Sequence, residues 1–62
     1  EEARLLRVLL WSLKPDYTRI IWLRFWAGFR FSECAEILGI SLDATKSRYR
    51  RAIIALTREW QA

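Results

Sequence analysis

The sequence predicts an all-α fold, a four-helix bundle that contains a helix-turn-helix. Apolar residues recur at steps of three and four along the chain, and no stretch alternates with the period of a strand. A short connection containing Gly39 joins the last two predicted helices, and the final helix combines an apolar face with a cationic one. The predicted helices cover about residues 2–13, 15–27, 31–38 and 42–60.

Length and composition indicate one small globular domain. The chain has 62 residues, of which 53% are hydrophobic and 15% aromatic, so residues 1–62 are expected to fold as one unit. A domain of this size buries only about 60% of its unfolded surface. No apolar run approaches the roughly 18 residues that a bilayer requires, so we expect no membrane partner. We also expect a cytoplasmic location. The chain lacks an initiator Met, which favours a piece of a longer protein.

The residue types argue against an enzyme. With one Cys and no His, the chain has no Cys/His metal cluster, no disulfide and no imidazole base. Cys34 lies at helical spacing with apolar neighbours and is expected to be a buried, unreactive thiol. We therefore predict no catalytic residue, no metal and no cofactor. The net charge of +4 and pI near 10.0 suit a polyanionic partner instead.

The first two helices carry more apolar surface than a core needs. The expected inner positions of helices 2–13 and 15–27 are Leu6, Leu9, Leu10, Leu13, Tyr17, Ile20, Ile21, Leu23 and Trp26. Four further apolar residues point to the other side at helical period: Val8, Trp11, Trp22 and Phe25. Pro15 suits the first position of its helix, and Gly28 is expected to end that helix in a left-handed conformation.

The helix-turn-helix prediction depends on spacing. Ala35 is small where two helices must approach closely, Gly39 follows four residues later at the turn, and Ile40 is expected to fill the corner. Ser32 is a possible cap for the helix over residues 31–38. Ser41 is the expected N-cap of the last helix.

The last helix is predicted to pack with one face and to contact DNA with the other. Its apolar positions are Leu42, Thr45, Tyr49, Ala52, Ile53, Leu56 and Trp60. Four cations lie between positions 46 and 51, with no acid among them. Cationic groups on the N-terminal half of a helix can reach guanine edges or phosphates in a major groove. On charge alone, a solvated cationic face is an equally good interpretation.

The segment from Leu13 to Leu56 resembles region 4 of bacterial sigma factors, particularly the extracytoplasmic-function group. The most specific parts are the proline-initiated helix, Leu23-Arg24 followed by Gly28, and the runs CAEILGIS and KSRYRRA. The resemblance implies a four-helix domain whose last helix enters the major groove of the −35 promoter element. It also implies that RNA polymerase holds the domain there through the flap of its β subunit.

The resemblance also assigns roles residue by residue. The groove-facing, base-reading positions of the family correspond to Lys46, Ser47, Arg50 and Arg51. The resemblance assigns Arg24 to a backbone phosphate and Arg48 to a structural or phosphate-facing role. Arg30 is a further phosphate candidate that departs from the family. Arg30 stands where the family usually has a capping Ser or Thr, which leaves its side chain available to a phosphate. Thr45 places a hydroxyl at a corner that is normally apolar, which we expect the helix to tolerate by bonding the preceding turn.

Two alternatives remain open at the level of sequence. In the first, the domain is a protein-interaction module whose main surface is formed by Val8, Trp11, Trp22 and Phe25, with an anti-sigma factor or the polymerase flap as partner. If the helix phases are shifted, however, those four residues simply fill the core. A response-regulator-type helix-turn-helix is the second alternative, but that class usually has His or Asn where Arg48 stands.

Overall fold

The computed structural model describes residues 2–61, with the side chains of residues 2, 3 and 6 excepted. The helices are α1 (Glu2–Trp11), α2 (Pro15–Ile21), which continues as the π-helix η1 (Trp22–Trp26), α3 (Phe31–Leu38) and α4 (Leu42–Gln61). Within the described range the chain is all helical, so the predicted fold class is confirmed. None of these helices has the length and hydropathy needed to cross a membrane.

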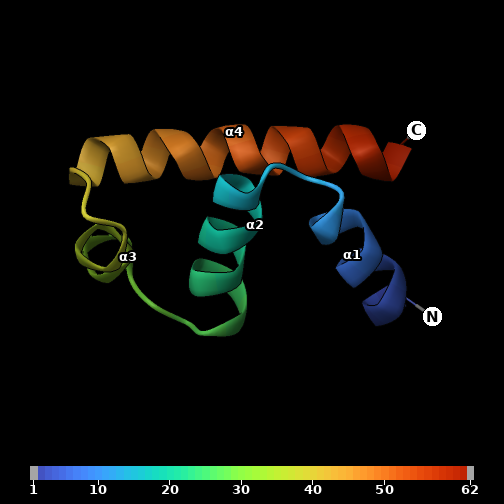
Figure 1. Cartoon of the computed structure of the whole chain (residues 1–62), viewed down its shortest axis with the longest axis horizontal. Helices are drawn as coiled ribbons and strands as arrows, with labels where there is room; N and C mark the ends of the chain where they lie inside the picture. The colour runs from blue at the N-terminus through green and yellow to red at the C-terminus, as the bar shows by residue number, and fades with distance from the viewer. Residues whose placement is uncertain (1, 62) are drawn as a thin grey trace.

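Helix α4 runs along the length of the molecule, and the other helices pack against one side of it (Figure 1). Helix α3 lies beneath its N-terminal end, α2 beneath its middle and α1 beneath its C-terminal part (Figure 1). This arrangement leaves the opposite side of α4 uncovered along its whole length. The helix predicted to contact DNA is therefore also the element that joins the other three.

The core forms where α2 crosses α4. Leu10, Ile20, Ile21 and Ala52 are buried, with Leu13, Tyr17, Leu38, Tyr49, Ile53 and Leu56 packed around them. Most of the predicted inner positions therefore belong to the core, whereas Leu9 and Leu23 are half-buried outside this cluster and Leu6 lies outside the described side chains. The expectation that Leu42 and Trp60 belong to the packed face of α4 is wrong, since they are 41% and 50% exposed. Both residues lie at the ends of α4, where fewer residues of the other helices are near enough to cover a side chain.

The break between α1 and α2 comes earlier than expected. Helix α1 ends at Trp11 rather than residue 13, and Lys14 has the extended ψ of 142° that a residue before proline prefers. The Thr18 hydroxyl donates to the Leu10 carbonyl across the break, at 2.5 Å. This bond satisfies a carbonyl at the end of α1 and ties α2 to it.

The end of the second helix differs most from the prediction of one α-helix over 15–27. From Trp22 onward the hydrogen bonds widen, with the Ala27 N–H donating to the Trp22 carbonyl at 3.0 Å. Trp26, predicted in the core, is 38% exposed and stacks on Trp22 with ring centroids 5.3 Å apart. The wider turn shifts the positions that follow it, so Trp26 moves out of the core. Gly28 then reverses the chain with φ of 76°, as predicted.

Candidate nucleic-acid interface

The turn between α3 and α4 has the predicted geometry. Gly39 adopts a left-handed φ of 69°, and the N–H groups of Gly39 and Ile40 donate to the carbonyls of Glu36 and Ala35 at 3.3 and 3.1 Å. This bonding satisfies the free carbonyls at the end of α3. Ala35 is buried, which allows the two helices to approach closely. The turn therefore fixes the direction in which α4 leaves α3.

The start of α4 is capped as expected. The Ala44 N–H donates to the Ser41 hydroxyl oxygen at 3.1 Å, which makes Ser41 the N-cap. Thr45 is fully buried, and its hydroxyl donates to the Ser41 carbonyl at 2.8 Å, one turn back. The expected hydrogen bond of this hydroxyl to the preceding turn is therefore present.

The start of α3 corrects one sequence prediction. Ser32 lies inside the first turn and does not cap the helix, which begins at Phe31. Arg30 occupies the position before the helix, and its backbone N–H donates to a Glu33 carboxylate oxygen at 2.8 Å. Because only its backbone takes part in this bond, the exposed Arg30 side chain is available for another partner.

Arg24 belongs to a stack of side chains that joins three helices. Its guanidinium carbon lies 4.8 Å from the centroid of the Phe31 ring, and Nη1 makes a long hydrogen bond of 3.5 Å to the Phe29 carbonyl. The Phe31 ring meets Tyr49 edge-on, with centroids 5.3 Å apart. The stack links η1, α3 and α4. Helical periodicity gave no signal for it, because its members come from three separate elements.

Cys34 is fully buried beside this stack, as predicted. Burial raises the pKa of its thiol, while the Arg24 charge lowers that pKa and the Glu33 charge raises it. A buried neutral thiol is a poor nucleophile, which agrees with a packing role. Among the described residues there is also no group of three or more His, Cys, Asp or Glu side chains that could hold a metal ion.

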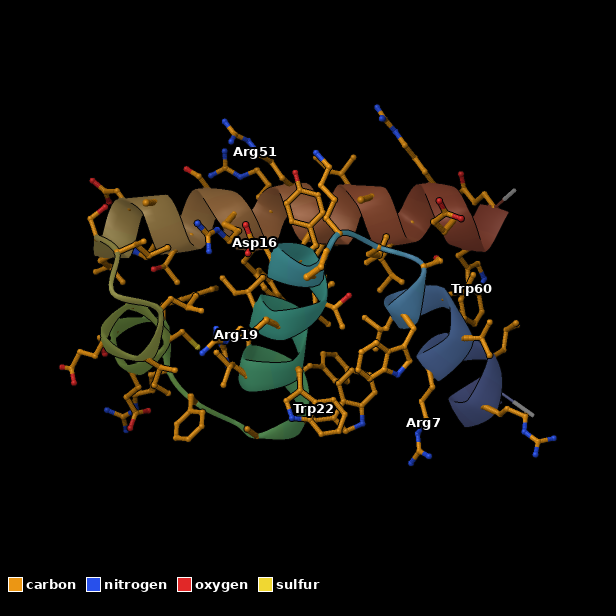
Figure 2. The ribbon with its side chains drawn as sticks, viewed as in Figure 1. Arg7, Asp16, Arg19, Trp22, Arg51 and Trp60 are labelled. Atoms are coloured by element: carbon orange, nitrogen blue, oxygen red, sulfur yellow. The ribbon has the colours of Figure 1, made fainter. Side chains whose placement is uncertain are left out.

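The four predicted base-reading residues form a broad face on the N-terminal half of α4. Lys46 and Arg50 border a shallow hollow shared with Phe31 of α3, while Ser47 and Arg51 border a groove on the other flank of the helix. At 3.6 residues per turn, Lys46 and Arg51 diverge by roughly 140°, with Ser47 and Arg50 between them. Figure 2 shows Arg51 on the side of α4 away from the other helices. Arg48 is half-buried at the edge of this face.

The four apolar residues predicted to point outward do so. Val8, Trp11, Trp22 and Phe25 are 61%, 80%, 50% and 66% exposed, so they do not fill the core. An apolar groove of about 630 Å³ opens between α1 and α2. Its lining consists of Arg7, Leu10, Trp11, Leu13, Pro15, Thr18, Arg19 and Trp22. Trp22 and Arg7 lie on the side of the molecule opposite α4 (Figure 2). Whether this surface binds a protein stays a prediction.

A comparison with protein-family models matches residues 3–56 to the family described as Sigma-70, region 4. Searches of curated proteins and of solved structures each found no match. The family match covers all of α3, the turn and most of α4, and its members are DNA-binding transcription domains rather than enzymes. A general role in promoter recognition follows from this membership. The chain, with its capped helix-turn-helix and uncovered cationic helix, belongs to the region 4 family of sigma-70 factors.

Proposed function

We propose that the domain binds the −35 element of bacterial promoters through α4, for transcription initiation, while RNA polymerase holds it through the β-subunit flap. The observation that carries this proposal is the position of Lys46, Ser47, Arg50 and Arg51 on the uncovered side of α4. The other side of that helix is anchored by buried Thr45 and Ala52. Both proposed partners are cytoplasmic in bacteria, so we place the domain in that compartment.

The proposed roles divide the cations into two groups. Lys46, Ser47, Arg50 and Arg51 read bases from the major groove, because the N-terminal half of a recognition helix lies deepest there. Arg30 and Arg48 contact phosphates from the edges of the reading face, and Arg24 is a third phosphate candidate. Arg24 differs from the others in that its guanidinium already contacts Phe31 and Phe29 within the protein. Its loss would therefore disturb the orientation of α3 as well as any phosphate contact.

The test compares base-reading with phosphate-binding variants on two DNA duplexes. One duplex is selected by the chain from a randomised pool, and the other is its scrambled counterpart. We expect Arg50→Ala and Arg51→Ala to lose about 1–3 kcal/mol of binding free energy on the selected duplex and much less on the scrambled one. Arg58→Ala serves as the matched control, because Arg58 is exposed in the last turn of the same helix.

Salt dependence gives an independent measurement on the same variants. With about four to six phosphate contacts, log K should fall with log salt at a slope of roughly −4 to −5 for the unaltered chain. Equal losses on both duplexes would make Arg50 and Arg51 phosphate ligands and overturn their assignment to bases. Failure of the pool to yield any preferred duplex would count against promoter recognition by the isolated domain.

A second function uses the exposed apolar residues of α1 and η1. Binding of an anti-sigma factor or of the polymerase flap is proposed for Val8, Trp11, Trp22 and Phe25, on the grounds of their exposure. This function is compatible with DNA binding, since Trp22 lies on the side of the molecule opposite α4 (Figure 2). The response-regulator alternative is not retained, because the chain matches the sigma family over residues 3–56.

A further inference from the structure

We propose that the polar groove between the start of α2 and α4 is a second binding site for the DNA backbone, with Lys14 and Arg48 as its phosphate ligands. Asp16, in the same groove, limits the affinity of that site. The proposal rests on the proposed function of α4 and extends the DNA contact to the start of α2.

The groove brings together residues that are about thirty positions apart in the sequence. It has a volume of about 460 Å³ and lies where α2 begins beside α4. Its lining consists of Lys14, Asp16, Tyr17, Ala44, Ser47, Arg48 and Arg51. The lining therefore contains three cationic side chains (Lys14, Arg48 and Arg51), two hydroxyl groups (Tyr17 and Ser47) and one carboxylate (Asp16). Ser47 and Arg51 also belong to the proposed reading face, so the groove is continuous with it.

The position of the groove matches the path of a DNA strand. The major groove is about 12 Å wide, and a helix with its side chains measures about 10–12 Å. A recognition helix therefore meets a sugar-phosphate strand on both flanks. On the flank of Lys46 and Arg50, the neighbour of α4 is Phe31 at the start of α3, next to Arg30. On the other flank, the neighbours are Lys14 and Asp16 at the start of α2.

Lys14 is held in place for such a contact. It precedes Pro15 at the start of α2, and the N–H groups of Tyr17 and Thr18 donate to its carbonyl at 2.9 and 3.1 Å. Its Nζ lies 5.8 Å from the centroid of the Tyr17 ring, within cation–π range. Tyr17 itself packs against the core. The two hydrogen bonds fix the backbone of Lys14 at the start of α2, and the contact with Tyr17 favours a position of its exposed side chain in the groove.

Asp16 accounts for the one opposing charge in the groove. It lies in the first turn of α2, where the helix dipole stabilises a negatively charged carboxylate. Figure 2 shows Asp16 at the end of α2 that meets α4. A phosphate in the groove would be repelled by this carboxylate and attracted by Lys14 and Arg48. Removal of the two charges should therefore change DNA affinity in opposite directions.

The test measures duplex binding by the chain at several salt concentrations for Lys14→Gln and Asp16→Asn. We expect Lys14→Gln to weaken binding to the selected and scrambled duplexes by a similar factor, and to reduce the steepness of the salt slope by about one. Asp16→Asn should tighten binding to both duplexes by about two- to fivefold at low salt. Arg4→Gln is the matched control, because it removes one exposed charge from α1 and should leave the slope unchanged.

The outcomes separate this proposal from the function on which it rests. If Lys14→Gln behaves like Arg4→Gln, or if Asp16→Asn weakens binding, the second backbone site is wrong. The reading helix remains supported in that case if Arg50→Ala still discriminates between the duplexes. If Arg50→Ala does not discriminate but the Lys14 and Asp16 effects appear, the groove binds DNA and promoter reading by α4 is wrong. Helix content by circular dichroism confirms that each variant is folded.

Discussion

Thr45 is the buried polar side chain among the residues whose side chains the structure describes. Its hydroxyl donates to the Ser41 carbonyl, which also accepts the Thr45 backbone N–H at 3.0 Å. The carbonyl therefore keeps one partner if the hydroxyl is removed. The remaining part of the side chain is a methyl group buried near the helix-turn-helix corner. The packing of that methyl group, more than the hydrogen bond, should decide the stability at this position.

Two substitutions separate the methyl group from the hydroxyl. Thr45→Ser removes the methyl and should lower the free energy of unfolding by about 1 kcal/mol. Thr45→Val removes the hydroxyl and keeps the shape, so it should cost less than Thr45→Ser, because no acceptor is left without a partner. Urea midpoints of the two variants give the comparison. A larger loss for Thr45→Val would show that the hydroxyl bond is the dominant contribution.

Individual residues could be predicted to different extents. The exposure of Lys46, Arg50 and Arg51 followed from helical period, because α4 packs against its neighbours from one side only. The surroundings of Arg24 and Lys14 could not be predicted in this way. Arg24 contacts Phe31 across a chain reversal, and Lys14 shares a groove with Arg48 of α4. Such contacts depend on the angles between helices, for which a single sequence carries no direct signal.

At the level of helices, boundaries marked by special backbone chemistry were predicted well. Helix α3 covers residues 31–38 as expected, and α4 begins at Leu42 after the Ser41 cap. The end of the second helix was predicted wrongly, because residues 22–26 are apolar except for Arg24 and lack a strong period. In such a segment, packing selects between an α-helical and a π-helical turn. The Trp22–Trp26 stack is one result of that selection.

The stability of the turn between α3 and α4 should depend on the backbone conformation of Gly39. A Cβ at this position would meet no atom within 4 Å, so the only restriction is the left-handed backbone with φ of 69°. Gly39→Ala should therefore lower the free energy of unfolding by about 1–2 kcal/mol, whereas Gly39→Asn should cost less, because Asn tolerates this conformation. Thermal unfolding of both variants measures the difference. Equal costs for the two variants would contradict the left-handed backbone as the cause of the destabilisation.

At the scale of the whole molecule, the proposed reading face and the exposed aromatic residues of α1 and η1 lie on different elements. The proposed reading face lies on α4, whereas Trp11, Trp22 and Phe25 belong to α1 and η1 on other parts of the surface. Trp22 projects on the side of the molecule opposite α4 (Figure 2). A domain with this arrangement can bind DNA through one surface and a protein through the other at the same time. The sequence indicated both surfaces, but their relative positions required the packing of α1 and α2 beneath α4.

Polar substitutions on the aromatic surface test this separation. Trp11→Gln should leave stability almost unchanged, because its side chain is 80% exposed. Trp22→Gln removes the stack with Trp26 and should cost about 0.5–1.5 kcal/mol. Both variants should bind the selected duplex like the unaltered chain and bind purified bacterial RNA polymerase core enzyme several-fold more weakly. Trp60→Gln is the matched control, because Trp60 is as exposed as Trp22 but lies at the far end of α4.

The three measurements on these variants give distinct answers. Loss of polymerase binding with intact folding and DNA affinity supports a protein-binding surface on α1 and η1. Unchanged polymerase binding in both Trp11→Gln and Trp22→Gln would remove the flap from the proposed partners and leave an anti-sigma factor as the candidate for that surface. Loss of DNA affinity in either folded variant would contradict the separation itself, because neither side chain lies near the reading face of α4. Since Trp11 stabilises the fold least, Trp11→Gln is the most sensitive variant for distinguishing a partner surface from a structural role.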